Sequence, residues 1–330
     1  CESTEEILNS EELGSQTFGH TNGVMDYSGI LRTLSEEQTK LLIKGSISPL
    51  PLHRTLRLLE AIEKFQHPEF SKYERLAVAS ALVDSIGNLR FGPEVGVGKT
   101  KTDAPVVANW LDKVRTTAED INLTKGFPNA DTQVIWGDAR SMPSPIAPNS
   151  IDSVITSPPY PNEKDYTRTT RLESVILGFI KNRYDLRSIK RGLVKSNTRG
   201  VYKDDDDDLF VSQFSGVQEL ADKIERERVR LNKTSGFERL YPRVTKLYFG
   251  GMARHFAELR RFLKPGANLA YVVGDQASYL RVMIRTGQCL SEIAQSLGYE
   301  VVGLDLFRTR FSTATKQNLQ EEVLVLRWPG

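Results

Sequence analysis

The chain has 330 residues, of which 39% are hydrophobic and 26% are charged, and its formal net charge is +2. This composition is typical of an ordinary soluble globular protein, and the length allows one large domain with insertions or two domains. Because the net charge is small, any nucleic-acid binding must depend on local clusters of Lys and Arg. No apolar run approaches the roughly 18 residues of a membrane-spanning helix, so no membrane association is expected.

Cysteine and histidine are scarce in the sequence. The two cysteines, Cys1 and Cys289, provide no disulfide framework, which is typical of the reducing cytoplasm. Neither they nor the four scattered histidines have the spacing of zinc ligands, so we expect no metal site. The chain begins with Cys1 and has no signal or targeting pattern, and we interpret it as lacking upstream sequence.

The first part of the sequence is predicted to be helical. Residues 1–35 are polar and predicted to form a loop, whereas apolar residues recur at three- and four-residue steps over residues 36–90. Leu50-Pro51 and residues 67–70 divide this stretch into separate helices, and a further helix is predicted over about residues 104–121. We therefore expect a mostly helical N-terminal region over residues 1–125.

Strands alternate with helices over residues 126–330. Strands are predicted at residues 133–136, 151–155 and 268–273, helices at 248–263 and 280–297, and closing strands at 299–307 and 322–328. This alternation predicts an α/β fold with a mostly parallel, doubly wound sheet and a terminal antiparallel hairpin. The first strand ends in Gly137-Asp138. The third ends in Gly274-Asp275, which we interpret as a strand-end turn.

A helical insertion at about residues 180–245 lies between the second and third strands. It contains a basic stretch, then five aspartates from Asp204 to Asp208, then a polar helix predicted over residues 217–231. Basic clusters bind phosphates regardless of sequence, so the nucleic-acid ligands predicted here are Lys190, Arg191, Lys195 and Arg199. The aspartates would repel DNA unless they face away. Closer to the second strand, Arg168 and Arg171 suit contacts with phosphates or flanking bases, with a solvated loop as the alternative.

The second strand leads directly into Thr156-Ser157-Pro158-Pro159-Tyr160. Prolines lack the backbone N–H and cannot continue a central strand, so the chain leaves the sheet stiffly at the strand's carboxyl end. Open α/β sheets bind their ligands at this edge. A hydroxyl, immobilised carbonyls and an aromatic ring placed there form a socket for a flat polar ring. The alternative is a turn that merely leaves a strand.

This segment resembles the catalytic signature of amino-group DNA methyltransferases, (Ser/Asp/Asn)-Pro-Pro-(Tyr/Phe), whose Ser form is most often associated with cytosine-N4 enzymes. The resemblance covers about residues 130–328 and includes the Gly-Asp strand end, the insertion, the Leu263-Lys264-Pro265-Gly266 turn and the terminal hairpin. It implies a Rossmann-like fold, S-adenosylmethionine as methyl donor, and a base flipped out of double-stranded DNA as substrate. The family often acts in restriction–modification.

The resemblance implies that Ser157, Pro158, Pro159 and Tyr160 are the catalytic residues. An exocyclic base amino group is a poor nucleophile, and acceptors aimed at its N–H groups would localise the nitrogen lone pair. The Ser157 hydroxyl and the Pro158 carbonyl would be these acceptors, while Tyr160 would stack on the flipped base. No nucleophilic cysteine is needed for this chemistry.

The resemblance also implies a cofactor site. In methyltransferases of this architecture an acidic residue at the end of the preceding strand accepts a hydrogen bond from the cofactor adenine. Here that residue is Asp138, and Gly137 and Thr156 are placed in the same site. The alternative for Asp138 is a helix cap or a turn.

The main cofactor motif of the family, a strand leading into Phe-x-Gly-x-Gly, is not evident in this sequence. Residues 91–100 are Gly-rich but lack the motif's acid and preceding strand, and their spacing is one residue too long for a P-loop. We interpret them as a loop near the substrate or cofactor, or as a linker. The missing motif is expected upstream of Cys1 or on a second polypeptide.

Three functional hypotheses remain. The first is a site-specific DNA methyltransferase, with cytosine N4 favoured over adenine N6 on the single residue Ser157. The second is a catalytically silent DNA-binding subunit or fragment. The third is an RNA amino-methyltransferase, because related signatures occur in such enzymes.

Overall fold

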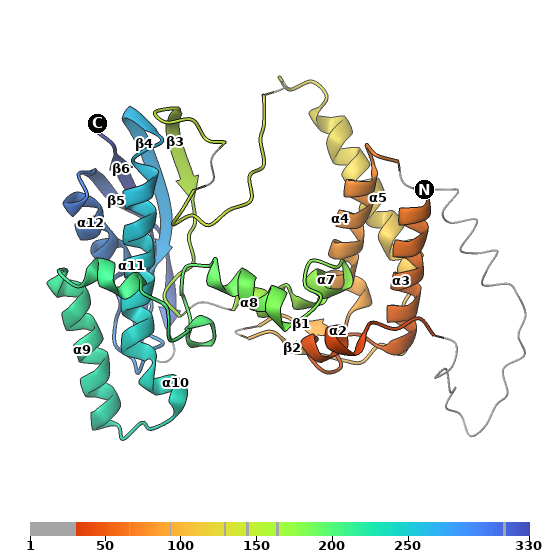
Figure 1. The fold of residues 1–330 in the computed structure, drawn as a ribbon, viewed down its shortest axis with the longest axis horizontal. Helices are drawn as coiled ribbons and strands as arrows, with labels where there is room; N and C mark the ends of the chain where they lie inside the picture. The colour runs from red at the N-terminus through yellow and green to blue at the C-terminus, as the bar shows by residue number, and fades with distance from the viewer. Residues whose placement is uncertain are drawn as a thin grey trace, which may run out of the picture. The chain divides into compact units, whose positions relative to one another are not determined.

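The computed structural model describes residues 31–330 except residues 66, 93, 129, 143–144, 163–164 and 313–314, so most of the loop predicted over residues 1–35 lies outside the described chain. The chain forms two compact units (Figure 1). A helical unit comprises the described parts of residues 31–132 and 166–188, and a sheet unit comprises those of residues 133–165 and 189–330. The helical unit thus extends past residue 125, and it includes residues 166–188 from later in the sequence.

The helical unit contains helices and one small β-hairpin. In chain order its elements are α2 (Glu36–Leu41), α3 (Pro49–Lys64), α4 (Ser71–Ala81), the π-helical turn η1 (Leu82–Ile86), β1 (Leu89–Arg90), β2 (Gly96–Val97), α5 (Val106–Thr124), α6 (Tyr166–Thr169), α7 (Arg171–Ile176) and most of α8 (Arg183–Arg191). The helices predicted within residues 36–90 and over 104–121 are confirmed. Gly96 and Val97 of the Gly-rich stretch form the second strand of the hairpin.

One apolar core holds the helical unit together. Leu58, Val78 and Trp110 from α3, α4 and α5 are fully buried in it, and the indole nitrogen of Trp110 donates to the Glu74 carbonyl at 3.0 Å. Leu172 of α7 is buried in the same core. This packing explains why residues 166–188 belong to the helical unit although they follow β3 in sequence.

The sheet unit is built on a mixed four-stranded sheet in the order β3-β4-β6-β5. Its elements are β3 (Ile151–Thr156), η2 (Thr198–Gly200), η3 (Asp207–Val211), α9 (Ser215–Arg230), α10 (Gly236–Arg239), α11 (Tyr241–Leu259), β4 (Leu263–Gly274), α12 (Thr286–Ser296), β5 (Glu300–Ser312) and β6 (Gln317–Arg327). The predicted hairpin and the helices at α9, α11 and α12 are confirmed.

Helices α11 and α12 share one core with one face of the sheet, and Figure 1 shows α11 running alongside β4. Leu269, Tyr271 and Val273 alternate along β4 and are buried in this core, because successive residues of a strand point to opposite faces. On the other face Val272 is only half-buried, and Ile155 of β3 is 85% exposed.

The expectation of a mostly parallel sheet is wrong for the described strands. Only β3 and β4 pair in parallel, whereas β4 with β6 and β6 with β5 pair antiparallel. The strand predicted at residues 133–136 is also wrong, since this segment is irregular and Val134 and Trp136 are 97% and 89% exposed. A short, largely apolar run becomes a strand only when a neighbour satisfies its backbone groups, and none of the described strands pairs with this one.

No helix of the described residues is both long enough and apolar enough to cross a membrane.

Gly250 marks a close approach of two elements in the sheet unit. It lies in the buried face of α11, where η3 crosses, and a Cβ built there would overlap the backbone carbonyl of Asp207. A backbone obstacle cannot rotate away as a flexible side chain can. We therefore expect this glycine to determine how η3 packs on α11.

We predict that Gly250→Ala lowers the free energy of unfolding by at least about 2 kcal/mol, because overpacking outweighs the roughly 1 kcal/mol that Ala gains over Gly in a helix. Urea denaturation measures the change. Gly236→Ala is the matched control, since a Cβ at Gly236 has no neighbour within 4 Å. Equal stability of Gly250→Ala and wild type would contradict the packing described here.

Candidate functional site

Ser157 lies where β3 ends and the chain leaves the sheet. Thr156 is in register with Tyr271 of the parallel neighbour β4, so the next residue reaches the level of Val272. The exposed Ser157 hydroxyl donates to the Val272 carbonyl at 3.2 Å. Ser157 is thereby fixed at the carboxyl edge shared by β3 and β4, with its oxygen lone pairs facing away from the bond that it donates.

Tyr160 packs against the end of the same neighbouring strand. It is half-buried, and its ring lies so close to Gly274 that a Cβ there would be 2.6 Å from Cε2. Ser157, Tyr160 and the end of β4 therefore meet at one edge of the sheet.

Asp138 is held by its neighbour Arg140. Arg140 donates to Asp138 from its backbone at 2.9 Å and from its guanidinium at 2.7 Å, and the other side of the guanidinium contacts Asp207 at 2.5 Å. Burial alone would raise the pKa of Asp138, but the hydrogen bonds from Arg140 outweigh it and lower the pKa. Asp138 is thus an anion at neutral pH, and 28% of its side chain is exposed.

His255 connects the segment that carries Asp138 to the sheet. Its Nδ1 lies 3.0 Å from the Ala139 carbonyl and its Nε2 2.7 Å from the Tyr271 hydroxyl. Since a carbonyl only accepts, Nδ1–H donates, and in the neutral ring Nε2 accepts from Tyr271. Burial lowers the pKa of His255, and it outweighs the opposing effects of the Ala139 carbonyl and Asp138.

Asp275 is a residue of this edge that the sequence interpretation missed. It follows Gly274 directly, its side chain is fully buried, and it forms an ion pair with Arg285 through Oδ2. Its Oδ1 is buried and has no hydrogen-bond partner among the residues that the structure describes. The sequence signal was present, because Gly274-Asp275 repeats the Gly137-Asp138 pattern at a strand end. Gly274-Asp275 was interpreted only as a turn.

The predicted nucleic-acid ligands of the insertion are largely engaged within the chain. Lys190 contacts Asp165 at 2.8 Å, Arg191 contacts Asp204 at 2.6 Å, and the Lys195 side chain is 1% exposed and lies 3.5 Å from Asp205. Burial lowers the pKa of Lys195. Two aspartates of the run therefore neutralise Arg191 and Lys195, and we expect the main role of Lys195 to be structural.

The remaining predicted ligands are distributed over both units. Arg171 belongs to the helical unit, where it donates to the carbonyls of Thr167 at 2.7 Å and Leu41 at 3.3 Å. Arg168 is in the same unit, and its Nε is buried without a partner. Arg199 follows the capping residue Asn197 in the sheet unit. The roles proposed for these residues in binding DNA stay predictions.

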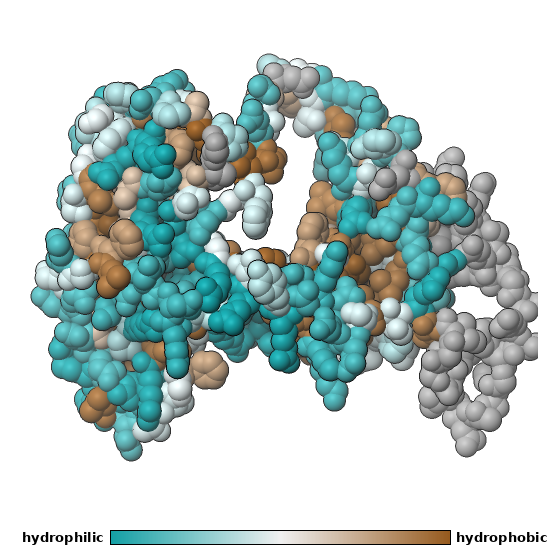
Figure 2. All heavy atoms as spheres, in the orientation of Figure 1, coloured by the Kyte–Doolittle hydropathy of each residue, from teal (hydrophilic) through white to brown (hydrophobic). Residues whose placement is uncertain are grey.

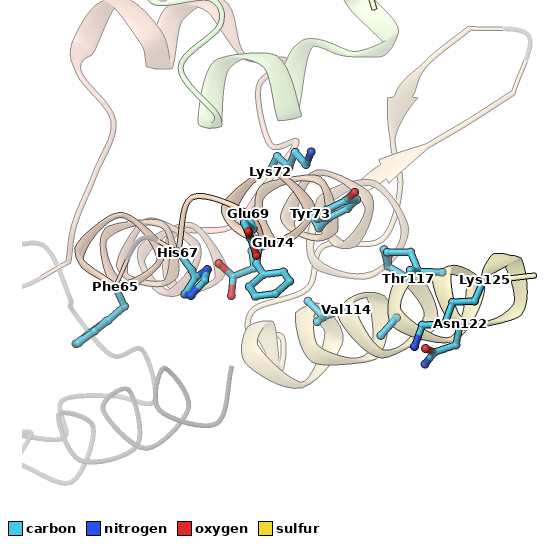
Figure 3. Close-up of a pocket in the computed structure, with 13 residues that line it drawn as sticks. Phe65, His67, Glu69, Lys72, Tyr73, Glu74, Val114, Thr117, Asn122 and Lys125 are labelled. Atoms are coloured by element: carbon cyan, nitrogen blue, oxygen red, sulfur yellow. The ribbon is translucent and has the colours of Figure 1, made fainter. Parts of the chain in front are cut away.

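A groove of about 750 Å³ in the helical unit contains none of the predicted site residues. It lies between α4 and α5 and includes Phe70, Tyr73 and Ile121 (Figure 3). Figure 2 shows apolar side chains gathered over the helices of this unit. Its lining includes titratable residues such as His67 and Glu69, but the catalytic signature of the sequence lies at the sheet edge of Ser157, which is therefore the better candidate for chemistry.

Comparisons with known proteins identify relatives of one kind. The chain is 31% identical over 176 residues to type II methyltransferase M.AvaI from Nostoc sp. PCC 7120, an alignment covering 50% of this chain and 34% of the relative. It is 28% identical over 232 residues to type II methyltransferase M.BsoBI from Geobacillus stearothermophilus, covering 66% of this chain and 45% of the relative. The chain thus spans less than half the length of these curated relatives.

A solved structure described as a DNA modification methylase from Thermus thermophilus also matches. It shares 22% identity, covers 25% of this chain and 37% of its own, and has a TM-score of 0.21. No family model matches the chain.

We predict that acidification destabilises the protein through His255. The pKa of His255 is lowered in the folded state, so below the ordinary histidine pKa of about 6.5 the unfolded chain binds a proton that the folded chain does not. The contribution of His255 to stability is therefore constant well above pH 6.5 and is lost as the pH falls below about 6.5. Between pH 7.5 and 5.5, wild type should therefore lose more stability than His255→Gln.

Urea denaturation at the two pH values measures the difference. His67→Gln, at an exposed histidine of the helical unit, controls for the loss of a histidine as such. If wild type and His255→Gln lose the same stability on acidification, the neutral buried His255 described here is wrong.

Proposed function

We propose that the chain transfers a methyl group from S-adenosylmethionine to an exocyclic amino group of a base in double-stranded DNA, as part of a restriction–modification system. The observation that carries the proposal is the placement of Ser157 and Tyr160 together at the carboxyl edge of β3 and β4. Similarity to two type II methyltransferases supports it. Cytosine N4 is proposed over adenine N6 because residue 157 is Ser.

The cofactor would be held in part by Asp138, with Gly137 and Thr156 lining the same site. Asp138 fits one contact of this cofactor, because it is an anionic acceptor with an exposed part, fixed by Arg140. Its oxygens already accept four hydrogen bonds from Arg140, and a carboxylate has about four lone-pair sites, so the amino donor would replace the longest of them, from Nε to Oδ2 at 3.3 Å. When bound, S-adenosylmethionine supplies a methyl group on a positively charged sulfur.

Ser157 would orient the base amino group. Its hydroxyl hydrogen is directed to the Val272 carbonyl, so its oxygen is left to accept from the base N–H. The Pro158 carbonyl would accept the second N–H, because the two prolines restrict its movement. Fixed acceptors of this kind favour the tetrahedral nitrogen that attacks the methyl carbon. As the new N–C bond forms, the bond from the methyl carbon to the donor sulfur would break and leave a neutral thioether, and the spare amino proton would leave to water, which reaches the exposed Ser157.

Tyr160 would stack on the flipped base. Aromatic side chains commonly hold extruded bases, and stacking contributes about 1–3 kcal/mol per base. One edge of the half-buried Tyr160 ring lies against Gly274, so that the ring offers a fixed surface. Orientation matters because the reacting atoms must be aligned within a narrow range.

A catalytically silent DNA-binding subunit or fragment is the second candidate. The Gly-rich residues around 91–100 lie in the hairpin of the helical unit, and none of the described strands of the main sheet leads into a Gly-rich loop. Titration of S-adenosylmethionine into the chain by calorimetry separates the candidates. Binding favours the enzyme, whereas DNA binding without cofactor binding favours the silent subunit.

We predict that Ser157→Ala lowers the rate of methyl transfer about 100-fold or more, as removal of one fixed dipole from a transition state does. Tyr160→Ala should also lower the rate, and Tyr160→Phe should retain most of it because the stacking ring remains. The assay measures labelled methyl incorporation into duplex DNA, with structured RNA as alternative acceptor and product analysis for N4-methylcytosine and N6-methyladenine.

Ser153→Ala is the matched control, since Ser153 is an exposed serine of the same strand β3. Its rate should equal that of wild type. Unchanged methylation by Ser157→Ala would refute the assignment of this edge as the active site.

A further inference from the structure

The ring of Tyr160 occupies the space in which a side chain of residue 274 would lie. A Cβ built on Gly274 would be 2.6 Å from Cε2, 2.8 Å from Cδ2 and 3.3 Å from Cζ of Tyr160, whereas ordinary contacts with a Cβ begin at 3.4 Å. One edge of the ring therefore rests on the bare backbone of β4.

The backbone of Gly274 is fixed from several directions. It pairs with Glu321 of β6, and its carbonyl accepts a hydrogen bond of 2.7 Å from the buried hydroxyl of Thr286. The next residue, Asp275, donates its N–H to the Gln320 carbonyl at 2.8 Å. This point therefore cannot shift without disturbing its bonds to β6 and to Thr286.

Tyr160, by contrast, belongs to no helix or strand and is half-buried. A Cβ at residue 274 would thus be accommodated by movement of the Tyr160 ring rather than of the sheet. Ser157 is anchored on the same strand, at the carbonyl of Val272, two residues earlier. Two residues of a strand span about 7 Å, so β4 determines both the position of the hydroxyl and that of the ring.

We propose that Gly274 is a positioning residue for methyl transfer, because its lack of a side chain sets where the Tyr160 ring lies relative to the Ser157 hydroxyl. The ring then stacks on a flipped base while Ser157 holds the amino group of the same base. This inference rests on the proposed function and adds to it a residue that positions the Tyr160 side chain. Gly274 itself touches no reacting atom.

The test compares Gly274→Ala with Gly303→Ala in the full chain. Gly303 lies in β5 of the same sheet, and a Cβ there would meet only Asp305, at an ordinary 3.5 Å. Each variant is labelled with 3-fluorotyrosine, and the fluorine resonance of Tyr160 is assigned as the one missing from Tyr160→Phe. This readout reports the position of the ring whether or not DNA is methylated.

Gly274→Ala is expected to shift the Tyr160 resonance and to lower kcat/KM for methyl transfer about tenfold to a hundredfold, as misplacement by about an ångström does. Gly303→Ala should do neither. Gly274→Ala in a Tyr160→Ala background should cause no further loss, because its effect passes through the ring.

The proposal is overturned if the Tyr160 resonance of Gly274→Ala stays where it is in wild type. It is also overturned if the resonance moves while kcat/KM does not, or if the losses of Gly274→Ala and Tyr160→Ala add. Absence of methylation by wild type on DNA would instead refute the proposed function. The resonance would then still decide whether Gly274 places the ring.

Discussion

The parallel pairing of β3 with β4 is the constraint on which the candidate site depends. The two strands run together until Thr156, where two prolines end β3, while β4 continues to Gly274. The last residues of β4 are thus left without a strand partner on that side, and an unpaired buried backbone carbonyl is costly. Ser157 satisfies the Val272 carbonyl with its side chain, and Tyr160 covers Gly274. The early end of one strand creates the place that these two side chains fill.

A network of ion pairs and hydrogen bonds also fixes the neighbourhood of this edge. Arg140 joins Asp138 to the buried Asp207 of η3, and Arg254 of α11 contacts Asp207 at 2.7 Å. His255 joins the neighbouring Ala139 to Tyr271 of β4. A buried charge that loses its partner is strongly destabilising, so such a network fixes geometry more than it adds stability. The segment that carries Asp138 and the strand that supports Ser157 are consequently held to one framework.

Local periodicity in the sequence was sufficient to predict α9, α11 and the hairpin of β5 and β6, because these elements have clear helical or alternating patterns. It failed at residues 133–136, where apolar side chains predicted a strand but no neighbouring strand among the described residues pairs with them. Pairing between strands depends on contacts distant in sequence, which periodicity does not record.

The candidate site, too, was predictable from local sequence patterns but not in its long-range contacts. The signature at Ser157 to Tyr160 was visible as a run of residues, and its place at a strand end followed from the prolines. The roles of Asp205 and Asp207 as partners of Lys195 and Arg140 were not visible, because they depend on how the insertion folds back. Nor was the contact between Tyr160 and Gly274, which joins residues far apart in the sequence.

The three tryptophans of the chain are divided between its two units, Trp110 in the helical unit and Trp136 and Trp328 in the sheet unit. Trp110 is completely enclosed, Trp136 faces solvent, and Trp328 contacts Tyr299 in a tilted arrangement with ring centroids 5.2 Å apart. Indole emission depends on the polarity around the ring, so each unit has its own intrinsic fluorophore. Single-tryptophan versions of the protein would therefore reveal whether the two units melt as one cooperative body or in separate steps.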